Sequence, residues 1–428
     1  MIGGISMKPK SIIFMMLTAV VWILLISTNI RANEDNIENH MVIMLEGSDI
    51  PNAVAKPIGS LSLAAIIDGY MEPIPYQIDE YNEGGAIYFD DWGVPIDGRK
   101  NIFDENDKLL FVFGDAGERK RTKTRYDGVI IDEISLIDGN GLVSYVYLVE
   151  DSRLRSEEQY VRYSAEEARV ETDFYSITYN KDNHIDWDDF SVSSYMNGGN
   201  PFDVLKIRLS ADIVGGLFSI DLDNRNVHMI PRAEKIGPIR TITQMEISLV
   251  YFGIPIYNIS LQLHHFPRSL TYDARSIIPR FRRMFISNPK MDFSLEGNAL
   301  FGTQVRTPFG PKAPAITDGK IDSVELAHRE FGLNETNNWI WASSQNDLDF
   351  LVFFEYSGSA KQELSLLYDD NLNRSDSLER FHGQSPNIGY RVHGLPRDGY
   401  FGFVVNLHMS EGFDGAPELF TDKIRNIP

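Results

Sequence analysis

One short segment concentrates cationic side chains in a chain that is otherwise strongly acidic. Residues 267–285, PRSLTYDARSIIPRFRRMF, hold five arginines, whereas the whole chain carries 40 Lys and Arg against 61 Asp and Glu, a formal net charge of −21. The planar guanidinium group matches the geometry of carboxylate and sulfate groups. The segment therefore predicts an anion-binding surface, and its ligand-binding candidates are Arg275, Arg280, Arg282 and Arg283.

Two adjacent histidines and a tyrosine next to these arginines suggest proton-transfer chemistry. If the protein is a lyase, His264 or His265 would be the general base and Tyr272 the acid, while the arginines would neutralise a uronate and make its neighbouring proton labile. Neighbouring residues on a strand face opposite ways, so at most one of the histidines can serve a given pocket. The alternative for the arginines is ordinary pairing with the abundant surface acids.

A loop between two expected strands is rich in oxygen ligands. Its candidates for a structural Ca²⁺ site are Asp97, Asn101, Asp104, Glu105 and Asp107. Calcium takes six to eight oxygens from such side chains, but the spacing departs from an EF-hand because Arg99 and Phe103 interrupt the series. The alternative is an acidic turn whose Asp and Asn side chains bond their own backbone.

Other chemistries have no support in the sequence. There is no cysteine, which excludes disulfides, thiolate metal sites and a cysteine nucleophile. GxSxG, HExxH, P-loop and dinucleotide-binding motifs are absent as well. Whether the protein is an enzyme therefore stays open.

The acidic loop belongs to a stretch, residues 72–117, in which the strand signals are clearest. Ile74, Tyr76 and Ile78 alternate with polar residues and proline, which is typical of a half-buried strand. Residues 109–113 form a continuous apolar run that ends at a Gly-Asp-Ala-Gly turn, as expected for a strand buried on both faces.

The rest of the chain repeats short strand signals separated by turn residues, and no stretch of fifteen residues has a clean helical face. Arg280 and Arg282 would share one face of an extended strand. A charged stretch, residues 151–169, marks the expected boundary between an N-terminal β domain at 33–155 and a β-sandwich at 156–428. The pattern predicts an all-β protein of antiparallel β-sandwich architecture, with the N-terminal domain the smaller of the two.

The N-terminus has the pattern of a secretory signal peptide over residues 1–32, with Lys8 and Lys10 before an apolar run and Ala32 at the expected cleavage site. An uncleaved anchor is the alternative. Cleavage would remove Lys8, Lys10 and Arg31 and change the net charge from −21 to −24. We expect an exported protein, periplasmic or extracellular, with no membrane span after cleavage and no nucleic-acid partner, because so acidic a surface repels phosphate.

Residues 73–117, with IPYQIDEYNEGG and FDENDKLLFVFGDAG, resemble exported bacterial β-rich proteins that include the family DUF4861. Gln77, Asp79, Asp104 and Glu105 carry the resemblance, and the loop VPIDGRKNIF departs from it. The resemblance implies a β-sandwich-like fold and an association with polysaccharide degradation, but it transfers no catalytic residue.

Two functions follow as hypotheses. The first is an exported carbohydrate-active or carbohydrate-binding protein whose partner is an anionic polysaccharide. The alternative is a non-enzymatic cell-envelope module that binds an envelope protein, which would show exposed apolar patches and no deep polar pocket.

Overall fold

The computed structural model shows an antiparallel β protein, 52% strand and 11% helix, so the predicted all-β sandwich is confirmed. It describes residues 37–121, 126–298, 300–344, 347–356, 363–371, 386–394, 400–412, 417–418 and 420–421. The expected signal peptide, residues 1–32, lies outside these ranges. Within them no helix is both long and apolar enough to span a membrane.

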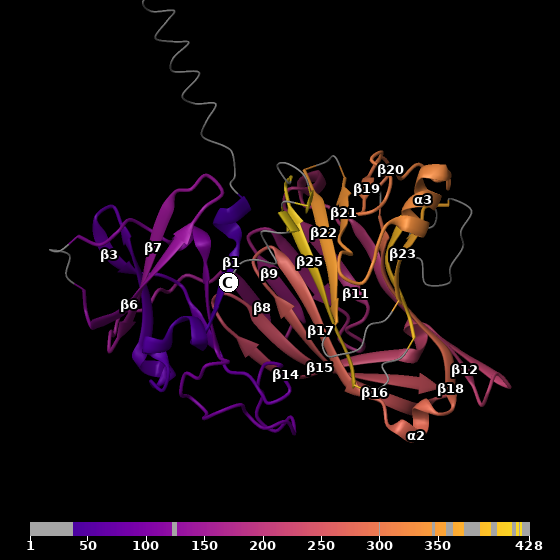
Figure 1. The fold of residues 1–428 in the computed structure, drawn as a ribbon, viewed down its shortest axis with the longest axis horizontal. Coiled ribbons are helices and arrows are strands. Elements are labelled where there is room, and N and C mark those ends of the chain that lie inside the picture. Colours follow the sequence, from indigo (N-terminus) through magenta and orange to yellow (C-terminus); the bar gives the residue numbers. More distant parts are fainter. Residues whose placement is uncertain are drawn as a thin grey trace, which may run out of the picture.

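Two small sheets form the part of the chain before residue 151, which we call the N-terminal unit (Figure 1, indigo to purple). The three-stranded sheet has the order β1 (Val42–Glu46), β5 (Lys108–Val112), β4 (Gln77–Asp79). The four-stranded sheet has the order β3 (Tyr70–Pro73), β2 (Leu61–Ile67), β7 (Val143–Glu150), β6 (Val129–Ile137). Their shared core includes Leu63, Phe103, Leu109, Phe111 and Leu148, all fully buried.

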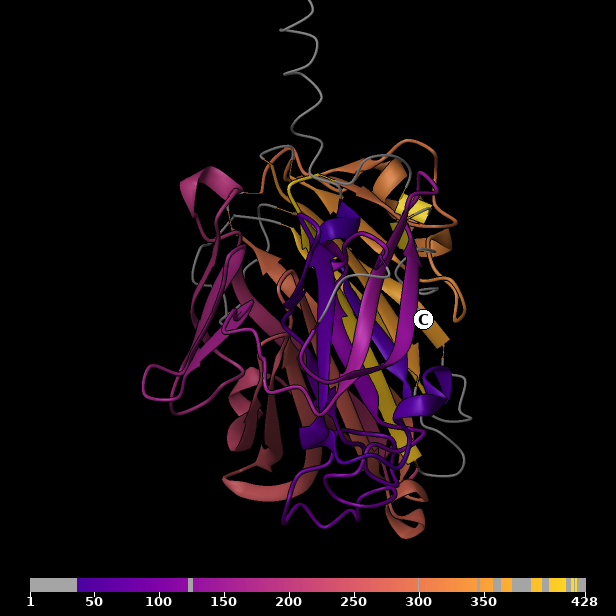
Figure 2. The same cartoon turned by 90° about the vertical axis from the view of Figure 1, so that its left-hand side faces the viewer.

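A nine-stranded sheet dominates the rest of the chain. Its order is β14 (Val227–Ile236), β15 (Thr241–Tyr251), β16 (Ile254–His265), β17 (Ser269–Ile277), β25 (Tyr400–Ser410), β22 (Asp349–Tyr356), β21 (Ile340–Ser343), β19 (Gln304–Arg306), β20 (Ala315–Ile316). No described sheet combines strands from the N-terminal unit with strands that follow residue 160. Figure 2 views the molecule from the side of the N-terminal unit, with the nine-stranded sheet behind it.

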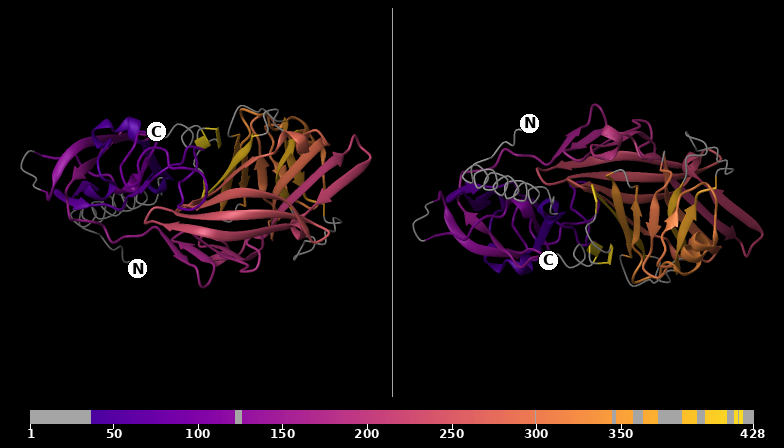
Figure 3. Two further views of the ribbon diagram at one scale, coloured as in Figure 1. Left: turned by 90° about the horizontal axis from the view of Figure 1, so that it is seen from below. Right: turned by 90° about the horizontal axis from the view of Figure 1, so that it is seen from above.

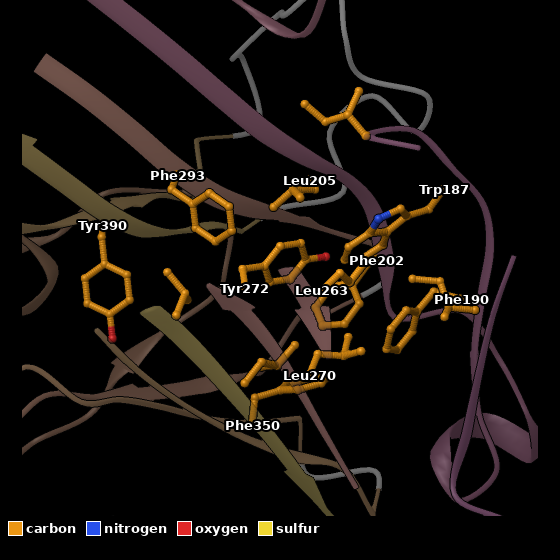
Figure 4. Packing of buried hydrophobic residues seen from close by; sticks show 14 of the residues in the cluster. Trp187, Phe190, Phe202, Leu205, Leu263, Leu270, Tyr272, Phe293, Phe350 and Tyr390 are labelled. Atoms are coloured by element: carbon orange, nitrogen blue, oxygen red, sulfur yellow. The ribbon is translucent and has the colours of Figure 1, made fainter. Parts of the chain in front are cut away.

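Two further sheets cover the apolar face of the nine-stranded sheet. The five-stranded sheet has the order β13 (Phe218–Leu222), β12 (Phe202–Ile213), β18 (Ile286–Gly297), β24 (Asn387–His393), β23 (Glu363–Asp369). The four-stranded sheet has the order β11 (Trp187–Val192), β10 (Tyr175–Tyr179), β9 (Arg169–Thr172), β8 (Val161–Ser164). Aromatic side chains fill the space between the layers: Phe202 lies 4.8 Å from Phe350, and Tyr272 lies 5.6 Å from Phe293, between ring centroids (Figure 4).

Two short helices, of four and nine residues, interrupt the β structure. Arg280–Arg283 form helix α2, so the expected shared strand face of Arg280 and Arg282 is wrong. Pro279 ends the strand because its ring fixes φ and removes an N–H donor. Helix α3, Ser323–Phe331, starts at a capping box in which Asp322 and Glu325 bond each other's backbone N–H groups. With nine residues, α3 is too short to give a helical face over a stretch of fifteen residues.

A buried ion pair fastens the N-terminal unit to the nine-stranded sheet. Asp79 on β4 accepts a hydrogen bond from Arg240 Nε at 2.8 Å, and both side chains are 3% exposed. Gln77 accepts from the backbone N–H of Arg240 at 3.0 Å and donates to Asp79. Burial alternates along this strand as expected, but the polar residues Gln77 and Asp79 are the buried ones and Ile78 is half-buried.

A close approach at Gly237 and further hydrogen bonds also hold the N-terminal unit against the nine-stranded sheet. A Cβ atom at Gly237 would lie 2.0 Å from Gln77 Oε1, so a larger residue there would displace the Gln77 amide from its hydrogen bonds. On the acidic loop, the backbone of Ile87 exchanges two hydrogen bonds with the side-chain amide of Gln262, at 2.9 and 2.7 Å. Trp92 donates to Ser260 Oγ at 3.0 Å. The loop thus packs on the sheet instead of projecting into solvent.

Replacing Arg240 by methionine should lower the free energy of unfolding by about 3–5 kcal/mol, because Asp79 would be left as a buried charge without a partner. The double variant Asp79→Leu/Arg240→Met should recover most of this loss. Chemical denaturation measures both. The control is Lys100→Met, which removes an exposed pair with Asp90 and should cost less than about 1 kcal/mol. Equal losses for Arg240→Met and Lys100→Met would contradict the account.

Candidate functional site

A cleft of about 440 Å³ lies between the N-terminal unit and the polar face of the nine-stranded sheet. We call it the interdomain cleft. The N-terminal unit contributes His40, Met41, Val42, Met44, Tyr81 and Lys108. The sheet and its connections contribute Arg240, His264, Phe266, Pro267, Arg268, Ser269, Thr271, Asp273, Phe353, Glu355, Val404, Asn406, His408, Met409, Ser410 and Phe420.

The floor of the cleft is built from side chains in register on four neighbouring strands. His264 on β16 pairs with Thr271 on β17, which pairs with Asn406 on β25, which pairs with Phe353 on β22. Thr271 donates to Asn406 Oδ1 at 2.8 Å. Because residues two apart on a strand share a face, Asp273 and Glu355 continue the floor in the next row.

His264 has a fixed tautomer because of its neighbour Arg240. Arg240 Nη1 lies 3.0 Å from His264 Nδ1, and a guanidinium only donates, so Nδ1 accepts and the ring proton sits on Nε2. Burial, with the charge of Arg240 second, holds the pKa of His264 well below its usual value. Nε2 is buried and has no hydrogen-bond partner among the described residues. His264 therefore presents an N–H donor that a ligand oxygen would satisfy.

Cationic and aromatic groups line the same cleft. Lys108 Nζ lies 3.3 Å from Glu46 Oε1 and 5.4 Å from the centre of the Tyr81 ring. The guanidinium of Arg268 lies 4.7 Å from the centre of the Phe174 ring. His408 stacks on Phe353 with ring centroids 5.4 Å apart, and burial lowers the pKa of His408 to about 4. The cleft thus combines charged groups with neutral imidazoles.

The structure separates the three residues expected to act in a lyase. His264 lines the cleft, whereas His265 and Tyr272 lie on the opposite, apolar face of the sheet. His265 Nε2 lies 2.8 Å from the hydroxyl of Tyr179. Tyr272 is packed among core side chains (Figure 4), and burial raises the pKa of its hydroxyl. With Nδ1 of His264 engaged by Arg240, the geometry favours a binding role for His264 over the role of a base.

The four arginines expected to bind an anion do not line the cleft either. Arg275 donates to both oxygens of Asp273, at 2.8 and 2.9 Å, and also bonds Gly84 O on the acidic loop. Arg280, Arg282 and Arg283 belong to α2, beyond the end of β17 at Ile277. Ile277 lies six positions after Thr271 on β17, which is about 20 Å at about 3.3 Å per residue.

The oxygens of the acidic loop largely bond its own backbone and side chains. Asp107 accepts from the N–H groups of Tyr81 and Asp104, at 3.2 and 2.8 Å, and burial raises its pKa to about 6. Asp104 accepts from Arg99 N at 2.9 Å, and Asp97 accepts from the side chain of Asn106 at 2.7 Å. Asn101 has a positive φ of 62°, and Glu105 is exposed.

Across the described ranges, no group of three or more His, Asp or Glu side chains is arranged to hold a metal ion. The Ca²⁺ site at Asp97, Asn101, Asp104, Glu105 and Asp107 stays a prediction.

Arg240 is the residue of this site that the sequence does not reveal. It stands alone in Gly-Pro-Ile-Arg, 161 positions from its partner Asp79. Its two partners, Gln77 and Asp79, do stand out in the sequence, because they are among the residues that carry the family resemblance.

The fold defines an all-β sandwich protein with a smaller β unit docked on the polar face of its largest sheet. No family model matches the sequence, and no curated protein matches it, so the resemblance of residues 73–117 stays a prediction.

Three solved structures are similar in part. An α-mannosidase from Enterococcus faecalis V583 has a TM-score of 0.45 at 9% identity, over 91% of this chain and 43% of that chain. A mutant of heparan sulfate lyase HepC from Pedobacter heparinus has a TM-score of 0.29 at 8% identity, over 58% and 34%. The family GH92 glycosyl hydrolase ccman5 has a TM-score of 0.25 at 11% identity, over 59% and 33%. The chain spans less than half the length of each. Likenesses this small carry no argument about activity.

The tautomer of His264 is directly measurable. In ¹⁵N-resolved NMR of the histidine rings, Nε2 of His264 should carry the proton, and the ring should still be neutral when the pH falls below the usual histidine pKa of about 6.5. A protonated Nδ1, or protonation of the His264 ring at its usual pKa, would contradict the geometry.

Buried histidines should also make the fold sensitive to acid. Burial lowers the pKa of His265 to about 3, so below about pH 6.5 the unfolded chain takes up a proton that the folded chain does not. The free energy of unfolding should then fall by about 1.4 kcal/mol per pH unit and per such histidine as the pH drops. His265→Gln should reduce this slope in denaturation curves between about pH 6.5 and pH 4. An unchanged slope for His265→Gln would refute the assignment.

Proposed function

We propose that the protein binds an acidic glycan in the interdomain cleft. The observation that carries the proposal is the buried Nε2–H of His264, which has no acceptor among the described residues and belongs to a residue that lines a cleft with cationic side chains. Buried polar groups are nearly always hydrogen-bonded. An oxygen of a bound ligand would supply the missing acceptor.

The composition of the cleft supports a glycan as that ligand. Asn406, Thr271 and Glu355 supply hydrogen-bonding groups for hydroxyls, and Phe353 and Tyr81 supply apolar surface beside them. Lys108 and Arg268 supply positive charge for a carboxylate or sulfate. Binding sites of this kind combine apolar walls with a few placed polar groups.

The positions of these residues fit a glycan-binding site better than a lyase active site. The expected acid, Tyr272, lies on the other face of the sheet from His264, so the two side chains do not meet one substrate. The arginines of α2 stand at the far end of β17. An envelope-protein partner, the alternative function, would not need a polar cleft.

Glycan binding is tested on a panel of uronic acid and sulfated polymers with neutral polymers beside them, by array and then by calorimetry. Acidic polymers should bind and neutral ones should not. Lys108→Met should raise Kd roughly tenfold or more, because a hydrogen bond to a charged group is worth about 1.5–3 kcal/mol. Arg119→Gln, which removes an exposed arginine paired with Glu133, should leave Kd unchanged.

A matched pair of variants isolates the His264 donor. His264→Gln keeps an N–H group near the position of Nε2, whereas His264→Leu removes it, and both lose the Nδ1 acceptor for Arg240. His264→Leu should therefore bind at least tenfold more weakly than His264→Gln at similar stability. Equal affinities for the two variants, or no binding by any acidic polymer, would refute the proposal.

A further inference from the structure

Apolar side chains crowd the exposed end of the sandwich farthest from the N-terminal unit. We call this surface the apolar tip, and it consists of Val214, Leu217, Phe218, Phe252, Ile254, Ile277, Phe281, Met284 and Phe285. Phe252 is 86% exposed, Met284 75% and Leu217 74%. Exposed apolar groups that gather in one place mark an interaction surface.

Hydrogen bonds show that the tip is one surface made from three turns. The N–H of Val214, after β12, donates to Phe285 O at 2.8 Å. Arg282 of α2 donates to Ile256 O at 3.0 Å, and Tyr257 donates to Ile277 O at 3.0 Å. Figure 1 places α2 and the ends of β12 and β18 together, and Figure 3 shows the hairpin of β12 and β13 extending beyond the body.

An apolar cavity of about 290 Å³ lies behind the tip, between the five-stranded and nine-stranded sheets. Ile207, Leu209, Ile220, Ile259 and Met291 line it and are only half-buried, although they pack against the main core of the sandwich. Protein interiors are normally close-packed. The two sheets therefore leave a space that suits an apolar chain.

The same end carries positive charge. Ile256, Ile278, Arg282 and Ile286 line the cavity on the side of the tip. Arg280 is exposed beside them, and within the described ranges no carboxylate pairs with Arg280 or Arg282. In a chain of net charge −21, basic groups next to exposed apolar side chains complement an acidic head group joined to an acyl chain.

We propose that this end of the sandwich binds an anionic lipid at a membrane surface. The acyl chain lies in the cavity between the sheets, the acidic head group pairs with Arg280 and Arg282, and the apolar tip enters the head-group region. The site is distinct from the interdomain cleft. Phe252 and Ile254 stand at the start of β16, whereas His264 stands at its end.

Co-sedimentation of the purified protein with vesicles tests the head-group contact. Vesicles with phosphatidylglycerol should bind at least tenfold better than pure phosphatidylcholine vesicles. Arg280→Gln/Arg282→Gln should lose about tenfold or more of this binding, because each basic residue near an anionic surface contributes on this scale. The matched control, Arg119→Gln/Arg162→Gln, removes two exposed arginines elsewhere and should bind as the unchanged protein does. Equal binding to the two vesicle types, or none, would overturn the proposal.

Displacement of a fluorescent anthroyloxy-stearate tests the cavity separately. Ala211→Trp fills the cavity and should abolish uptake of the probe, while Ala165→Trp, at an exposed turn, should not. Probe uptake that Ala211→Trp leaves unchanged would refute the cavity site. Light scattering adds a further check: a dimer that Phe252→Ser dissociates would assign the tip to a second copy of the chain and overturn the lipid proposal.

Discussion

The buried ion pair between Asp79 and Arg240 is the interaction on which the arrangement of this protein depends. Removing two charges from water costs several kcal/mol per ion, and here Gln77, His264 and the face of the Phe266 ring surround the pair. Its main effect is therefore positional. It fixes the N-terminal unit against the nine-stranded sheet, and through the other edge of the guanidinium it sets the tautomer of His264. A single arginine thus joins the fold to the chemistry of the interdomain cleft.

The nine-stranded sheet separates two environments by the alternation of its side chains. On β16 and β17, Leu263 and Tyr272 enter the core, whereas His264 and Asp273 face the N-terminal unit. The polar face supports a cleft for a hydrophilic ligand. Aromatic side chains occupy the centre of the apolar face, and a cavity of about 290 Å³ lies toward α2. The sheet thus separates the two proposed binding sites, which lie on its opposite faces and toward its opposite ends.

Local patterns in the sequence were enough to predict the class of fold. Period-two alternation and frequent turn residues gave the antiparallel β-sandwich, and the apolar run at residues 109–113 became the central strand β5. Helix α3 was missed because its nine residues are few, although its capping box is visible. The cleft could not be predicted, because its parts meet only through tertiary contacts such as the pairing of Asp79 with Arg240 across 161 positions. Clustering along the sequence was misleading, because strand β17 separates the histidines at the end of β16 from the arginines of α2.

The central claim is that His264 Nε2–H meets an oxygen of an acidic glycan. The most direct test records the Nε2–H proton and nitrogen resonances of His264 during titration with an acidic oligosaccharide and with a neutral one of equal length. The account predicts that both resonances shift and saturate with the acidic ligand, in step with the calorimetric binding curve, and do not move with the neutral ligand. Unmoved resonances at saturation with the acidic ligand would contradict it.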